Sequence, residues 1–135
     1  MGKKRPAVVR RVCVPNSICK SHRWHLFERD IMDDITKHVI GDSTEISLDT
    51  MRSDSRSLRD TNARMLAMTI ASVLHPKWRL QHIGAYFNRE ISDVRCAAKL
   101  VSNAVKHASP TSLRREALRV CARMGLLPAQ LILKN

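Results

Sequence analysis

Apolar residues recur three or four positions apart along most of the chain after residue 23, which predicts helices that each bury one face. The first such segment runs from Trp24 to Ile40 and is followed by a glycine, Gly41. Its apolar positions are Phe27, Ile31, Ile35 and Val39. No segment alternates apolar and polar residues as a half-buried strand does, so the pattern predicts an all-α fold in one compact helical domain.

A second long helix is predicted to begin with Asp60 or Thr61 as its N-cap and to end near Leu74, before Pro76. Its apolar stripe consists of Ala63, Leu66, Ala67, Ile70, Ala71 and Leu74, and Met65, Met68 and Val73 widen it. A helix that is apolar over most of its circumference lies in the centre of a domain. We therefore expect Leu66 and Ile70 to be fully buried.

Residues 79–107 are predicted to form a helix-turn-helix. The small Gly84 suits the point where the two helices cross, Asn88 tolerates the left-handed conformation of a tight turn, and Val94 packs the second helix on the first. The apolar face of the second helix is predicted at Ile91, Val94, Ala98, Val101, Val105 and Ala108. The opposite face carries Ser92, Arg95, Cys96, Lys99, Asn103 and Lys106. That face suits a DNA groove, although an ordinary helical hairpin with a solvated face fits the same spacing.

The last predicted helix begins at Ser109 and Pro110 and ends at Gly125. Its inward positions are Leu113, Ala117, Val120, Cys121 and Met124, and an outer basic row consists of Arg114, Arg115, Arg119 and Arg123. Residues 128–135 form a short apolar tail that docks either on the body of the protein or on a partner. The predicted helical domain therefore spans residues 23–127.

The charge balance favours an anionic partner. The 135 residues contain 24 Lys and Arg against 12 Asp and Glu, so the net charge is +12, which favours nucleic acid above other partners. Every charged residue before Glu28 is basic, and residues 1–22 lack apolar periodicity, so they are predicted to be a flexible basic arm. A solubilising tail and a minor-groove arm both fit this segment. Only 4% of the residues are aromatic, which is few for stacking on single-stranded bases, so double-stranded DNA is the favoured partner.

A second basic segment precedes the central helix. Arg52, Arg56 and Arg59 lie in the Ser- and Asp-rich stretch MRSDSRSLRD, and Arg64 follows on the helix. By itself such a stretch is typical of a solvated connector. Next to a helix-turn-helix it is a candidate contact with phosphates or with the minor groove.

Other functional classes lack a matching motif. No apolar run is long enough to span a membrane, and the chain is expected in the cytoplasm, associated with the nucleoid, with reduced cysteines. The spacing of Cys13, Cys19, His22 and His25 matches no common zinc framework, so no metal is predicted. The chain contains no G-x-x-x-x-G-K-[ST] sequence, so no nucleotide or other cofactor is expected. Its six histidines are scattered outside nucleophile and metal motifs, so we do not expect an enzyme.

The order of these features resembles the C-terminal DNA-binding domain, domain IV, of the bacterial replication initiator DnaA. That family has a basic loop, an R-x-x-A-M-x-L/I-A helix, an I-G-x-x-F turn and an R-D-H-[ST]-T-V sequence that opens the recognition helix. The matching strings here are RMLAMTIA at residues 64–71 and IGAYFNR at residues 83–89, followed by Val94. The resemblance covers residues 27–106.

The resemblance implies roles for individual residues. Arg56 or Arg59 corresponds to an arginine that enters the minor groove, Arg89 to one that works at the DNA backbone, and Lys99 to a basic position further along the recognition helix. The family's Asp-His-Thr-Thr is Glu90-Ile91-Ser92-Asp93 in this chain. Ile91 offers only apolar contact and the Asp93 carboxylate repels phosphate, so we expect weak binding to the family's usual initiator box and a shifted sequence preference.

Two hypotheses about function follow. The first is a double-stranded DNA-binding regulator of replication initiation or transcription, whose predicted DNA-binding residues are Arg52, Arg56, Arg59, Arg64, Arg89, Glu90, Ile91, Ser92, Asp93, Arg95 and Lys99. The second is a protein-interaction module that keeps this fold but binds a replication or transcription protein. The acids of the predicted recognition helix and of the first helix, Asp30, Asp33 and Asp34, support the second hypothesis.

Overall fold

A computed structural model describes residues 26–107 and 110–133 of the chain. Within these residues the elements are α3 (Leu26–Ile40), α4 (Leu48–Arg52), α5 (Leu58–Leu74), α6 (Leu80–Tyr86), α7 (Ile91–Lys106), α8 (Ser112–Met124) and the 3-10 helix η1 (Pro128–Leu131). The described ranges contain no strand, so the predicted all-α fold is confirmed. None of their helices is long and apolar enough to cross a membrane. The predicted basic arm and the Cys13–His25 segment lie outside the described residues.

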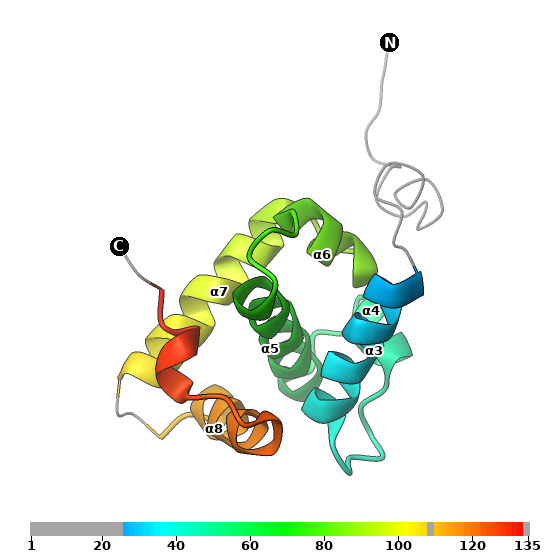
Figure 1. Ribbon diagram of the computed structural model, residues 1–135. Coiled ribbons are helices and arrows are strands. Elements are labelled where there is room, and N and C mark those ends of the chain that lie inside the picture. Colours follow the sequence, from blue (N-terminus) through cyan, green and yellow to red (C-terminus); the bar gives the residue numbers. More distant parts are fainter. Residues whose placement is uncertain (1–25, 108–109, 134–135) are drawn as a thin grey trace.

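Helix α5 forms the centre of the core. In Figure 1 it lies in the middle of the molecule, between α3 on one side and α7 on the other, with α8 below it. The α5 side chains of Ala67, Ile70 and Ala71 are 0% exposed, and Leu66 is 1% exposed, so the predicted burial of Leu66 and Ile70 is confirmed. Helix α3 adds Met32 to this core besides the predicted Ile35 and Val39.

The start of α5 differs from the prediction. The N-cap is Ser57, whose side-chain oxygen accepts a hydrogen bond from the backbone N–H of Asp60 at 3.1 Å. Asp60 therefore lies inside the first turn, where it is buried and accepts a hydrogen bond from the Ser55 hydroxyl at 2.7 Å. That bond is the main reason why the pKa of Asp60 is lowered. The helix thus begins at Leu58, before Asp60 and Thr61, and Arg59 belongs to the helix and not to the loop.

The C-terminal part of the chain also differs from the prediction. Helix α8 is capped by Thr111, later than the predicted start at Pro110, and it ends as predicted at Gly125, whose φ of 71° is left-handed. For residues 128–133 the structure agrees with one of the two expected alternatives, because Leu131 of η1 is 1% exposed and belongs to the core. The backbone N–H of Leu133 donates to the Ser102 hydroxyl at 2.8 Å. The segment therefore docks on the body of the protein, against α7.

Candidate nucleic-acid interface

Helices α6 and α7 are joined by a four-residue turn, Phe87 to Glu90. Asn88 has a φ of 57°, which confirms the left-handed conformation predicted for it. The backbone N–H of Arg89 folds back to donate to the carbonyl of Gly84 at 2.8 Å. The Asn88 side chain donates to the Arg52 carbonyl at 3.4 Å, which ties the turn to the end of α4.

Gly84 lies where the two helices approach each other. A Cβ atom at this position would lie 2.7 Å from the Arg89 carbonyl oxygen and 3.1 Å from a methyl group of Val94. Val94 itself is 0% exposed. The absence of a side chain at Gly84 therefore sets how closely α7 packs on α6, as the sequence predicted.

The two faces of α7 separate clearly. All six residues of its predicted polar face, Ser92, Arg95, Cys96, Lys99, Asn103 and Lys106, are exposed. On the inner face Val94, Val101 and Val105 are buried as predicted, but Ala97 is buried in place of Ala98, which is only half-buried along with Ile91. Ala108 lies outside the described residues. The exposed face is basic and runs along the whole helix.

A groove of about 820 Å³ lies between the loop after α4, α5 and the start of α7. We call it the α7 groove. It brings together six of the predicted site residues, Arg52, Arg56, Arg64, Arg89, Glu90 and Asp93. Ile91, Ser92, Arg95 and Lys99 continue from it along α7.

Three of the four groove arginines are held by backbone carbonyl groups. The Arg52 side chain donates to the Tyr86 carbonyl at 2.7 Å, and its guanidinium lies 4.7 Å from the centre of the Tyr86 ring. Arg64 donates to the Met51 carbonyl at 3.1 Å. Arg89 donates to the Ser53 carbonyl at 2.6 Å and to two carbonyls of its own turn. The bonds of Arg52 and Arg89 join α4 and the loop after it to the end of α6 and the α6–α7 turn, and the bond of Arg64 joins α5 to α4.

Positive charges are crowded in this groove. Arg64 is only 8% exposed, and burial together with the nearby Arg89 guanidinium lowers the pKa of Arg64. A cluster of like charges at a concave surface favours an anion, because each anion relieves the repulsion between the arginines. Three carboxylates, those of Asp54, Glu90 and Asp93, line the same groove and oppose this effect, so four cations stand against three anions. The Asp93 carboxylate accepts a hydrogen bond from the backbone N–H of Glu90 at 3.0 Å.

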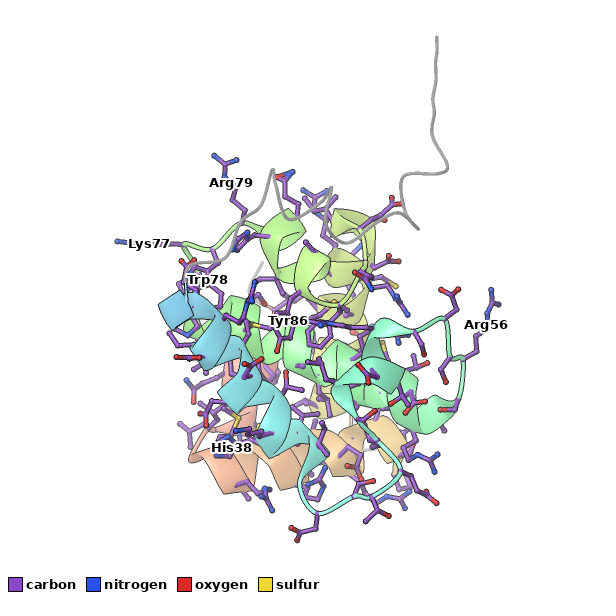
Figure 2. The ribbon with its side chains drawn as sticks, turned by 90° about the vertical axis from the view of Figure 1, so that its right-hand side faces the viewer. His38, Arg56, Lys77, Trp78, Arg79 and Tyr86 are labelled. Atoms are coloured by element: carbon purple, nitrogen blue, oxygen red, sulfur yellow. The ribbon has the colours of Figure 1, made fainter. Side chains whose placement is uncertain are left out.

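Arg56 and Arg59 point to different places. Arg56 is exposed, and Figure 2 shows it extending away from the protein on the loop between α4 and α5. Arg59 is not part of the α7 groove; it forms an ion pair with Glu45 and lines a separate groove beside α8. Of the two candidates for a minor-groove arginine, only Arg56 therefore lies beside the start of α7.

Several polar residues at this end of the molecule were not among the DNA-binding residues predicted from the sequence. Ser53, Ser55, Thr61 and Asn88 also line the α7 groove. The Ser-rich composition of the loop was a visible signal, but only the fold shows which of its residues line the groove. Two further exposed cations, Lys77 and Arg79, precede α6 and extend from the side of the view opposite Arg56 in Figure 2.

Comparison of the chain with models of protein families, with curated proteins and with solved structures finds no match. Within residues 26–107 and 110–133, no three His, Cys, Asp or Glu side chains come together as a metal site would require.

Proposed function

We propose that the protein is a double-stranded DNA-binding regulator of replication initiation or transcription. The observation that carries the proposal is the α7 groove, whose lining includes four arginines beside the exposed basic face of α7. Basic side chains that flank a helix of this kind are suited to neutralise phosphates on either side of a major groove. The net charge of +12 supports the same class of partner.

The proposed DNA-binding residues form two groups, one suited to contact the DNA backbone and one suited to contact bases. Arg56 is free to reach a phosphate or the minor groove, and Arg52, Arg64 and Arg89 add positive charge behind it. In a helix-turn-helix, which the α6–α7 pair resembles in its short turn and close crossing, the first residues of the second helix meet base edges. Ile91 and Ser92 take that position here.

The resemblance to DnaA domain IV supports a role in replication or transcription. The differences from that family fall at residues 90–93, which we propose to lie next to base edges. Asp93 belongs to the first turn of α7, where its carboxylate accepts a hydrogen bond from the Glu90 backbone. The structural role of Asp93 as a capping residue gives a reason for a carboxylate at this position that does not depend on DNA.

A protein-interaction module is the second candidate. It is favoured by the acids at the mouth of the α7 groove, Glu90 and Asp93, and by the exposed Asp30 and Asp34 on α3. These groups would weaken DNA binding through repulsion of phosphate and would suit a basic protein surface.

The test is binding of the full chain to duplex DNA at increasing salt concentration. If phosphates are contacted, the logarithm of the affinity falls linearly with the logarithm of salt concentration. The change Arg56→Gln is expected to reduce the slope by about 1, because one phosphate contact is lost. The matched control is Arg115→Gln, an exposed arginine of α8 outside the α7 groove, which should leave the slope unchanged.

Each result has a clear meaning for the two candidates. Affinity that is indifferent to salt would refute the DNA hypothesis. Equal effects of Arg56→Gln and Arg115→Gln would show that only overall charge matters and that the α7 groove is not the contact. Absence of DNA binding at micromolar protein would favour the protein-interaction module instead.

A further inference from the structure

A second groove, of about 730 Å³, lies on the other side of α5. It is formed where the end of α3, the start of α5 and α8 meet, and we call it the α8 groove. Its lining shares no residue with that of the α7 groove, because the two use different faces of α5. A ligand of the α8 groove is therefore additional to the proposed function and does not depend on DNA binding.

The wall of the α8 groove is largely apolar. Its apolar residues are Val39, Ile40, Ile46, Leu58, Ala63 and Leu66. Leu58 is the most informative of these, because it stands in the first turn of α5 and is 65% exposed. A large apolar side chain at the lip of an apolar groove gains free energy when a ligand covers it. The volume lies within the range of small-molecule sites, about 300–1,000 Å³.

The charged part of the lining consists of three arginines, Arg59, Arg119 and Arg123, and two carboxylates, Asp42 and Glu116. Arg59 on α5 is paired with Glu45, and Arg119 on α8 donates to Glu116 at 2.6 Å and to the Val39 carbonyl at 2.9 Å. These two arginines already have partners.

Arg123 follows one turn after Arg119 and also lines the groove. It is exposed and has no ion pair or hydrogen bond among the described residues. Its guanidinium carbon lies 3.8 Å from the position of a Cβ on Gly41, so the charge stands at the edge of the groove beside the end of α3. The groove thus offers an apolar wall and the available guanidinium of Arg123, with the exposed Asp42 carboxylate in the same lining, so the comparison of an anionic with a cationic ligand decides which of the two charges governs binding.

We propose that the α8 groove binds a small amphipathic anion, with an apolar chain or ring against Ile40, Ile46 and Leu58 and a carboxylate on Arg123. The carboxylate matches Arg123 because charge-assisted bonds between guanidinium and carboxylate are the strong ones. The chain's own N-terminal residues do not meet this description, since every charged residue before Glu28 is basic.

The experiment titrates the full-length protein with decanoate and follows backbone amide shifts by NMR. The comparison ligand is decyltrimethylammonium, which has the same chain and the opposite charge. Decanoate is expected to shift residues of the α8 groove and to bind at least about tenfold more tightly than the cation. Equal binding of the two ligands, shifts centred on another surface, or no binding at millimolar concentrations would each overturn the proposal.

Two pairs of variants locate the contacts. Arg123→Gln should weaken decanoate binding about five- to tenfold, whereas Arg115→Gln, on the same helix but outside the groove, should not. Leu58→Ser should weaken it at least about threefold, and Leu127→Ser should not, although Leu127 is similarly exposed at 69%. All four changes are on exposed side chains, so the fold is retained.

If a second copy of the chain fills the groove in place of a small ligand, the oligomeric state of the protein reveals it. If the ligand-free protein sediments as a dimer and Leu58→Ser makes it a monomer, the groove is an interface with a second copy and the proposal is wrong. A monomer whose decanoate affinity falls with Arg123→Gln supports the proposal.

Discussion

Replacement of Gly84 by alanine is the most direct perturbation of the α6–α7 arrangement. The new Cβ would lie 2.7 Å from the Arg89 carbonyl oxygen, 3.3 Å from the Arg89 carbonyl carbon and 3.1 Å from a Val94 methyl group. The first of these is a backbone atom, so relief requires movement of the turn and not only of a side chain. That movement would also stretch the 2.8 Å hydrogen bond from the Arg89 N–H to the Gly84 carbonyl.

The expected cost follows from two opposing effects. Overpacking a closed interface costs about 1–3 kcal/mol, occasionally more, and loss of the strained hydrogen bond adds about 1 kcal/mol. Alanine regains up to about 1 kcal/mol of helix propensity over glycine. We therefore expect Gly84→Ala to lower the free energy of unfolding by about 1–3 kcal/mol, equivalent to roughly 4–12 °C in the melting temperature.

The assay is urea unfolding followed by circular dichroism, with Gly125→Ala as the matched control. Gly125 has a left-handed φ of 71°, and a Cβ added there would meet no atom within 4 Å, so alanine costs only about 1 kcal/mol of backbone strain. Adding Val94→Ala to Gly84→Ala should not restore stability, because the backbone contact remains. A smaller loss for Gly84→Ala than for Gly125→Ala, or rescue by Val94→Ala, would refute the reasoning.

Three further predictions concern the core, the pH dependence and the base contacts. Leu66→Ala should lower the free energy of unfolding by about 2–5 kcal/mol in the same assay, because this 1%-exposed side chain leaves a cavity in the core. The pKa of Asp60 is lowered chiefly by the Ser55 hydrogen bond, so this carboxylate stabilises the fold above its unfolded pKa, and the stabilisation is lost as the pH falls below about 4. The free energy of unfolding of Asp60→Asn should therefore depend less on pH in that range. Ile91→His combined with Asp93→Thr should shift binding toward the initiator box in competition with scrambled DNA, and a native chain that already prefers the box about tenfold would contradict this.

The helix faces could be predicted from the sequence because they depend on local spacing. The exposed face of α7 follows directly from the period of its polar residues, and the turn follows from Gly84 and Asn88, each of which meets a steric demand at its own position. The fold class required nothing more than these local regularities.

The start of α5 could not be predicted, because several residues there are good caps. Ser55, Ser57, Asp60 and Thr61 each have a side chain that can accept a hydrogen bond from a helix N-terminus. Ser57 is the N-cap in the structure, and Asp60 is then buried in the first turn. That burial depends on residues that only the tertiary fold brings next to Asp60. The choice of Ser57 as the N-cap in turn places Arg59 on the side of Glu45 and away from the α7 groove.

The arginines that line the α7 groove were among the residues named from the sequence, but their hydrogen bonds could not be predicted. The carbonyl groups that hold Arg52, Arg64 and Arg89 lie 34, 13 and 36 residues away in the sequence, respectively. Contacts at such separations leave no periodic trace in a single sequence. The pattern therefore showed where positive charge gathers and could not show which arginines are already bonded.

The difference between hydrogen-bonded and unbonded arginines determines how substitutions at the α7 groove are to be interpreted. Arg89 donates to the Ser53 carbonyl and to its own turn, so Arg89→Ala removes a cation and also frees the loop that carries Arg56. A loss of DNA affinity in that variant would combine a lost charge with a misplaced loop, and the two could not be separated. Arg56 has no such bond to another described residue and is exposed, so its substitution changes charge alone. Arg52, Arg64 and Arg89 thus hold the loop in position through their hydrogen bonds. Substitution of Arg56, which has no such bond, tests directly whether the loop contacts a phosphate.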